Sequence, residues 1–171
     1  SDLVKYEYAP IALAPDKEDE TGCFSGGAIV DKENPEKLHL FYTKHFEKDG
    51  DIIETQGIAS SEDGIRFEKR ERPVIDTKMV EGYAKTSDVR DPIPYYKNGI
   101  YYIVVGTKNN QHNGRFIVFK SKDLNTYTFH DYIEGYELFG TMAECPDIID
   151  FEQDNVLLFS KIEYIDSLKK N

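Results

Sequence analysis

Alternating apolar and polar positions, together with short runs of β-branched and aromatic residues, dominate this sequence and predict β-strands. The clearest stretches are residues 38–43, 100–105, 115–120 and 156–160. Turn-forming pairs separate the strands and predict where hairpins close: Asp49-Gly50, Asp63-Gly64, Asn98-Gly99 and Asn113-Gly114. The only helix-like stretch is a turn or two within residues 162–170. The pattern therefore predicts an all-β chain.

A turn motif recurs along the chain at a nearly constant interval. An Asp, a turn and an aromatic residue four positions later occur at Asp2, Asp63 and Asp123. The intervals are 61 and 60 residues, and a serine stands two positions before each of the last two copies. Four-stranded sheets that repeat at one long interval are typical of β-propeller blades, whereas a sandwich would not predict in-phase copies of one turn.

The repeat also places three strand openings in phase, at residues 25–30, 89–94 and 144–149. Each unit is interpreted as three strands, the Ser-x-Asp turn and a fourth strand. This predicts one partial propeller domain over residues 1–171, with units at about residues 1–8, 9–69, 70–129 and 130–171. The ring is incomplete, so strand edges are open at both ends, which favours self-association.

Composition and charge narrow the classes of partner. The 171 residues include 21 basic and 32 acidic side chains, a formal charge of −11, which argues against nucleic acid or an anionic membrane as partner. No apolar run approaches the roughly 20 residues that span a bilayer. Cys23 and Cys145 form no C-x-x-C pair, and the four histidines have no ligand spacing, so no metal or other cofactor is predicted.

The absence of a visible signal peptide favours the cytoplasm over secretion, although the chain begins at Ser1 rather than Met.

Several motifs follow one another in an order that identifies a family. They lie at residues 8–16, 23–28, 41–43, 56–64, 90–92 and 144–147. In this order and at these spacings the chain resembles glycoside hydrolase family 32, which includes invertases, sucrose-6-phosphate hydrolases, levanases and inulinases. The resemblance extends from Asp2 to about Lys161. Any one tripeptide is weak evidence, but the ordered set agrees with the propeller repeat.

The resemblance implies a retaining β-fructofuranosidase built on a five-bladed β-propeller, usually followed by a β-sandwich. In the family the nucleophile lies in an Asn-Asp-Pro-Asn-Gly motif on the first blade, and no Asn-Asp-Pro occurs in this chain. We therefore expect a fragment that holds the end of blade 1, blades 2 and 3 and the start of blade 4. Such a fragment alone should be inactive, because without a nucleophile no fructosyl-enzyme forms. The alternative is a divergent member that begins at Ser1.

The resemblance also assigns roles to individual residues. Glu144, in Glu-Cys-Pro, matches the family's general acid/base, and Asp91, in Arg-Asp-Pro, matches its transition-state stabiliser. Arg90 would orient Asp91 and reach a sugar hydroxyl or other carboxyl groups. Phe24 and Ser25 match a pair that lines the substrate, a small β-fructofuranoside. Retaining glycosidases need two carboxyl groups roughly 5–5.5 Å apart, so the second would come from the missing motif.

Structural interpretations compete with these roles. Taken singly, Arg90-Asp91-Pro92 is typical of a solvated turn and Glu144 of an exposed acid. In register with the repeat, they favour a sugar-binding funnel instead. Two positions depart from the family: Ala143 stands where a Trp is common, which would widen the pocket, and Asp88 adds a carboxylate.

Other functions remain open at this point. A non-catalytic fructoside-binding module would keep the funnel without turnover. A fructosyltransferase of the same family would use the same carboxylates and differ in its acceptor. A related arabinan- or xylan-cleaving propeller would share Arg-Asp-Pro, but it fits the Glu-Cys-Pro-Asp and Phe-Ser-Gly motifs poorly. The choice among sucrose, sucrose 6-phosphate and fructans cannot be made from these residues.

Overall fold

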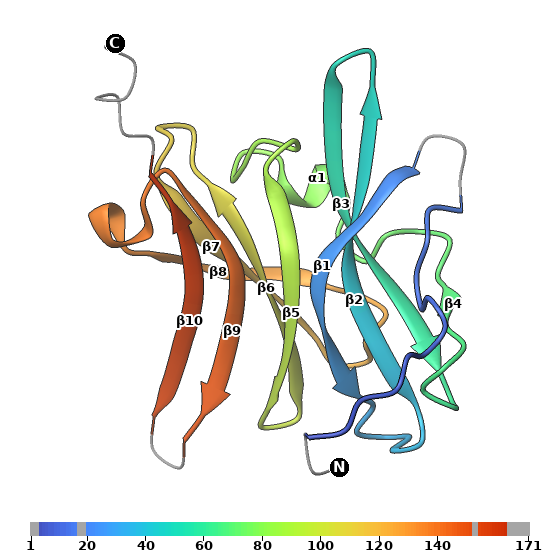
Figure 1. Cartoon of the computed structure of the whole chain (residues 1–171). Helices are drawn as coiled ribbons and strands as arrows, with labels where there is room; N and C mark the ends of the chain where they lie inside the picture. The colour runs from blue at the N-terminus through green and yellow to red at the C-terminus, as the bar shows by residue number, and fades with distance from the viewer. Residues whose placement is uncertain (1–3, 17–19, 152–153, 164–171) are drawn as a thin grey trace.

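The computed structural model describes residues 4–16, 20–151 and 154–163, which form three antiparallel sheets (Figure 1). The first sheet has the order β1 (Glu20–Val30), β2 (Leu38–Lys48), β3 (Asp51–Ser61) and β4 (Glu68–Lys69). The second has the order β5 (Val89–Lys97), β6 (Ile100–Lys108), β7 (Gly114–Ser121) and β8 (Thr128–Glu134). The third pairs β9 (Met142–Asp150) with β10 (Asn155–Ile162). The predicted architecture of four-stranded antiparallel blades is confirmed.

In the described part of the chain, two short helices interrupt the strands, and neither was predicted. These are α1 (Thr77–Val80) and the 3-10 turn η1 (Tyr136–Phe139). The side chain of Asp76 caps α1 by accepting hydrogen bonds from the backbone N–H groups of Lys78 and Met79. The sequence predicts a helix-like stretch at residues 162–170, but Ile162 is the last residue of β10, so the prediction is wrong at its first residue. Residues 164–170 lie outside the described part of the chain. None of the described helices has the length and apolar character needed to cross a membrane.

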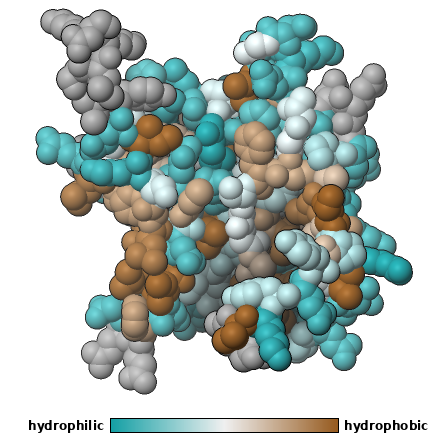
Figure 2. Space-filling view, in the orientation of Figure 1, coloured by the Kyte–Doolittle hydropathy of each residue, from teal (hydrophilic) through white to brown (hydrophobic). Residues whose placement is uncertain are grey.

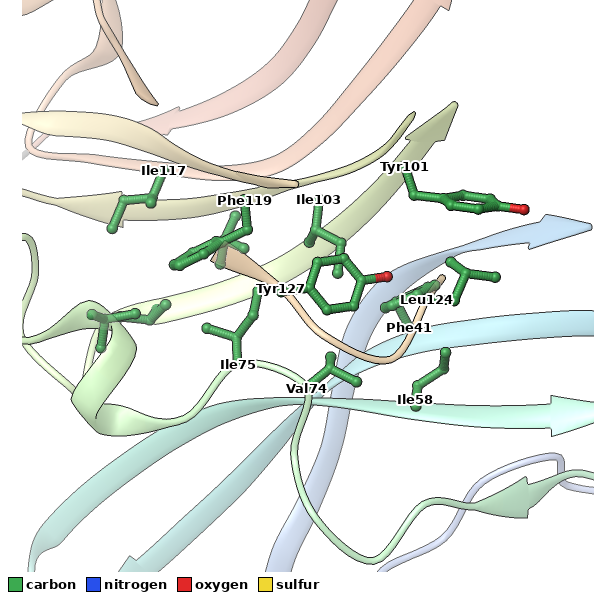
Figure 3. Packing of buried hydrophobic residues seen from close by; sticks show 13 residues of the cluster. Phe41, Ile58, Val74, Ile75, Tyr101, Ile103, Ile117, Phe119, Leu124 and Tyr127 are labelled. Atoms are coloured by element: carbon green, nitrogen blue, oxygen red, sulfur yellow. The ribbon is translucent and has the colours of Figure 1, made fainter. Parts of the chain in front are cut away.

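The sheets pack face to face, and their first strands, β1, β5 and β9, lie side by side (Figure 1). Strands β6 and β7 are buried on both faces, which explains their continuous apolar sequence. Ile103 and Phe119 enter the cluster shared with the first sheet (Figure 3), whereas Val104 and Phe116 enter the cluster shared with the third. These two apolar layers fix the relative placement of the three strand openings.

The third sheet leaves apolar side chains exposed, as Figure 2 shows over β9 and β10. Ile149, Val156 and Leu158 are among them. The expected self-association through open edges stays a prediction, as do the residue boundaries of the repeat units.

Three of the predicted pairs lie where hairpins close, two of them as two-residue turns and one at the end of a longer loop. The pairs Asp49-Gly50 and Asn98-Gly99 join β2 to β3 and β5 to β6, and all four residues have positive φ, as a type I′ turn requires. Gly114, by contrast, belongs to β7. A Cβ there would lie 2.4 Å from the carbonyl oxygen of Phe139, so close packing rather than turn geometry requires glycine at this position.

The repeated Ser-x-Asp turn forms the same hydrogen bonds in both described copies. Asp63 Oδ1 accepts from the N–H groups of Ile65 and Arg66, both at 2.8 Å. Asp123 Oδ1 accepts from those of Asn125 and Thr126, both at 2.9 Å. Ser61 and Ser121 each donate a hydroxyl to the corresponding carboxylate. The copy at Asp2 begins outside the described residues.

These turns predict part of the acid sensitivity of the fold. The N–H groups of Thr126 and then Asn125 lower the pKa of Asp123 in the folded chain. The turn therefore contributes stability above the unfolded pKa of about 3.9, and that stability is lost as the pH falls through the lowered folded value. Urea denaturation between pH 2.5 and 7 should show a shallower loss of unfolding free energy in D123N than in the wild type. Equal slopes would contradict this assignment.

Candidate active site

The openings of β1, β5 and β9 bring together residues that are far apart in the sequence. Arg90 and Glu144, 54 positions apart, are joined by a hydrogen bond of 3.1 Å from Arg90 Nη1 to Glu144 Oε1. One residue further along each strand, the N–H of Cys145 donates to Asp91 Oδ2 at 2.8 Å. Two parallel connections therefore link the Arg-Asp-Pro and Glu-Cys-Pro motifs.

Asp91 has an unusual backbone for a strand residue. Its φ is +59°, where β5 shifts register against β6, and the facing Cys145 has a φ of +47°. A non-glycine residue in this left-handed region costs about 1–3 kcal/mol and persists only where its surroundings hold it. The opening of β5 is therefore a strained segment that presents the Asp91 carboxylate to β9.

Buried polar residues of β2 and β3 hold this strained segment. The N–H of Asp91 donates to Thr43 Oγ1 at 2.9 Å, and Gln56 Nε2 donates to the carbonyl of Val89 at 2.6 Å. Thr43 and Gln56 are cross-strand partners and hydrogen-bond each other at 3.2 Å. The first sheet thus fixes the strand that carries Arg90 and Asp91.

Arg90 lies among three carboxylates. Its Nε donates to Glu54 Oε2 at 3.1 Å, and its Nη1 donates to Glu144. Asp88 Oδ1 lies 3.7 Å from Nη2 and also pairs with Lys108 at 3.0 Å. Burial alone would lower the pKa of Arg90, but Glu54, Glu144 and Asp88 together raise it. The expected reach of Arg90 to another carboxyl group is thus observed at Glu144, whereas the Asp91 carboxylate is held by Cys145.

Phe24 and Ser25 lie at a register shift of β1, between Phe24 and Gly26. The exposed Phe24 ring stacks on the His45 ring, with centroids 4.2 Å apart. Gly22 leaves room for this ring, because a Cβ at Gly22 would lie 2.5 Å from it. The Ser25 carbonyl lies 3.4 Å from Thr43 Oγ1. The pair therefore adjoins the polar residues that support Asp91.

Gly26 makes this register shift possible, and its replacement should be costly. A Cβ at Gly26 would lie 1.9 Å from the carbonyl oxygen of Phe41, so the backbone of β1 would have to move. G26A should lower the free energy of unfolding by about 1–3 kcal/mol. The matched control is G27A, whose Cβ would meet the side chains of Ile93 and Pro94. Urea denaturation should show the larger loss for G26A, and the reverse order would contradict this role.

The structure also shows where Ala143 and Asp88, the two residues that depart from the family pattern, lie. Ala143 is fully buried in the apolar cluster between the second and third sheets. A larger side chain there would meet the packed core, so the expected widening of a pocket at Ala143 is not seen. Asp88 is held by Lys108 and Arg90, and it joins the charged group around the guanidinium.

Sequence reasoning missed Glu54, and it gave no role to Thr43 and Gln56, although both stand in the family motifs at residues 41–43 and 56–64. It noted His45 only as a histidine without ligand spacing. The sequence did contain a sign of this polar cluster, because polar residues occupy alternate positions in parts of β2 and β3, two strands that also carry buried apolar residues. Glu54 faces His45, and Gln56 faces Thr43 across β2 and β3. Alternation alone does not show which face is buried, and packing against the second sheet decides it.

The chemistry of this site rests on acids and a cation. Glu144 is partly exposed and can give a proton to a ligand oxygen, whereas Asp91 is buried and can offer a fixed negative charge. Within residues 4–16, 20–151 and 154–163, no three His, Cys, Asp or Glu side chains gather to hold a metal ion.

Comparisons with known proteins place the whole chain in one family. Residues 1–170 match the family model for the glycosyl hydrolases family 32 N-terminal domain. The sucrose-6-phosphate hydrolase of Bacillus subtilis is 34% identical over 166 residues, covering 93% of this chain and 33% of that protein. The Escherichia coli sucrose-6-phosphate hydrolase is 33% identical over 171 residues, with the same coverage.

Solved structures agree in fold. The Bombyx mori family 32 β-fructofuranosidase aligns with a TM-score of 0.73 at 32% identity, covering 96% of this chain and 34% of that one. The Lactobacillus gasseri sucrose-6-phosphate hydrolase aligns with a TM-score of 0.75 at 27% identity, covering 86% and 30%. The chain thus spans about a third of the length of these relatives. It belongs to glycoside hydrolase family 32, and its sheets are blades of a partial β-propeller.

Proposed function

We propose that this chain supplies the acid/base Glu144 and the transition-state stabiliser Asp91 of a retaining β-fructofuranosidase. The substrate would be sucrose, sucrose 6-phosphate or a fructan. The observation that carries the proposal is the double connection between β5 and β9. It holds Glu144 against Arg90, and Asp91 against the N–H of Cys145. Sucrose-6-phosphate hydrolases among the relatives support this substrate class and a place in the cytoplasm.

The proposed roles are those that the family resemblance implies, and the geometry supports them. In the first step, a carboxylate outside this chain would attack the anomeric carbon while Glu144 gives its proton to the departing oxygen. In the second, Glu144 would take a proton from the water that releases fructose. Asp91 would hold fructosyl hydroxyls as positive charge develops on the ring. Phe24, whose ring is exposed beside this group, would contact the sugar.

The test uses the full-length polypeptide that the gene encodes, incubated with sucrose, sucrose 6-phosphate and inulin. Release of free fructose from at least one of them is the expected result. Oligofructosides as the main products would indicate a fructosyltransferase instead. Micromolar binding of a fructoside without turnover would indicate a binding module and would overturn the proposal.

A further inference from the structure

Glu54 is a fully buried carboxylate outside the motifs that suggested the function. Its Oε2 accepts from the N–H of Val89 at 3.0 Å and from Arg90 Nε at 3.1 Å. Its Oε1 lies 3.2 Å from His45 Nδ1, and the residue is 1% exposed. Burial raises the pKa of Glu54 despite the opposing effects of Arg90, His45 and the Val89 N–H. Burying a carboxylate is costly even when it is paired, so packing alone is a poor explanation for Glu54.

The guanidinium of Arg90 connects Glu54 directly to Glu144. Glu54 binds Nε at one end of the planar group, and Glu144 binds Nη1 at another corner. Because the guanidinium is a rigid fork, anchoring Nε fixes the direction in which Nη1 points. The Ser87 carbonyl, which accepts from Nη2 at 3.1 Å, completes the anchor. Glu54 and Glu144 are therefore joined through one rigid, anchored cation.

Charge gives Glu54 a second effect on Glu144. A general acid must carry its proton when the leaving group departs, and an uncompensated cation at hydrogen-bond distance favours loss of that proton. At pH values where Glu54 is ionised, its charge offsets that of Arg90. Asp88 also faces the guanidinium, but Lys108 pairs with Asp88 and weakens its effect. The other titratable groups of the cluster are Asp91 on β5, Cys145 on β9 and His45 on β2.

We propose that Glu54 is a positioning residue for the acid/base. Acting through Arg90, it orients the Glu144 carboxyl group and provides the counter-charge that lets Glu144 hold its proton. This inference rests on the proposed function. It is separate from the roles of Glu144 and Asp91, because Glu54 reaches the reacting atoms only through the guanidinium.

The test compares E54Q with the wild type in the full-length enzyme, on two substrates. On sucrose, whose leaving oxygen needs a proton, kcat should fall about 10- to 100-fold while KM changes little. The alkaline limb of the pH–kcat profile should move to lower pH. On an aryl β-fructofuranoside with an acidic phenol, which departs without a proton, kcat/KM, which reports only the formation of the fructosyl-enzyme, should fall less than about threefold. The matched control E47Q removes an exposed acid 3.9 Å from His45 and should leave both substrates and the profile unchanged.

A conservative variant keeps the test decisive if E54Q does not fold. E54D retains the charge but withdraws it from Arg90 Nε, so kcat/KM for sucrose should fall while kcat/KM for the aryl fructoside and the pH profile stay near wild type. Equal losses on both substrates, in either folded variant, would show a merely structural role and overturn the inference. A wild-type enzyme inactive on every fructoside would overturn the proposed function as well, which separates the two failures.

Discussion

Replacement of Glu144 by Gln in the full-length enzyme is expected to lower kcat for sucrose by about 10²–10⁴-fold, the range that general acid–base catalysis supplies. The Gln side chain has the same shape, and its amide oxygen can still accept from Arg90 Nη1, which now lies 3.1 Å from Glu144 Oε1. What it loses is the proton for the departing oxygen. Steady-state kinetics on sucrose, with circular dichroism as a check on folding, measures this effect.

The leaving group separates loss of the acid from general damage. With an aryl β-fructofuranoside, the first step no longer needs the acid, so E144Q should lose much less of its rate in forming the fructosyl-enzyme. The matched control is D150N, an exposed acid near the other end of β9. It should behave as the wild type does. An E144Q enzyme that hydrolyses sucrose within tenfold of the wild-type rate would contradict the assignment of Glu144.

Replacement of Asp91 by Asn is expected to lower kcat by about 10²–10³-fold, the effect of removing one electrostatic contact to a transition state. Asn tolerates the left-handed backbone that Asp91 adopts, with its φ of +59°. Its amide oxygen can also accept from the N–H of Cys145. The fold should therefore survive, and the variant should lack only the negative charge.

The substrate pattern distinguishes D91N from E144Q. Positive charge develops on the fructosyl ring whatever the leaving group, so D91N should lose similar factors on sucrose and on the aryl fructoside. Initial rates on both substrates measure this. Selective loss on sucrose alone would show that Asp91 acts on the leaving group, contrary to the role proposed here.

The sequence was informative where local pattern and repeat agreed. Turn pairs such as Asn98-Gly99 specify a positive φ at both positions, so the hairpin could be predicted from chemistry alone. Arg90, Asp91 and Glu144 were found through the family resemblance of their motifs, which also stand at strand openings that recur in phase, and the structure joins them there. Propeller geometry explains why residues 54 positions apart can meet.

Other features depend on packing that no local pattern encodes. Glu54 and His45 alternate along their strands as solvent-facing residues would, yet Glu54 is buried against Val89 and Arg90. The Asn113-Gly114 pair predicts a turn, but Gly114 begins β7, and the close approach of Phe139 explains the glycine. The α1 helix is a single turn capped by Asp76, too short to show a helical period. For Glu54 and Gly114, a partner from a distant segment determines the role.

Azide rescue of E144A in the full-length enzyme tests the role of Glu144 most directly. Without a general base, water attacks the fructosyl-enzyme slowly, whereas azide is already anionic and needs no deprotonation. With an aryl β-fructofuranoside as substrate, we expect azide to restore turnover and to yield a β-fructosyl azide identified by NMR. Sucrose hydrolysis by E144A at the wild-type rate, with no effect of azide and no azide product, would contradict the assignment of Glu144 as the acid/base.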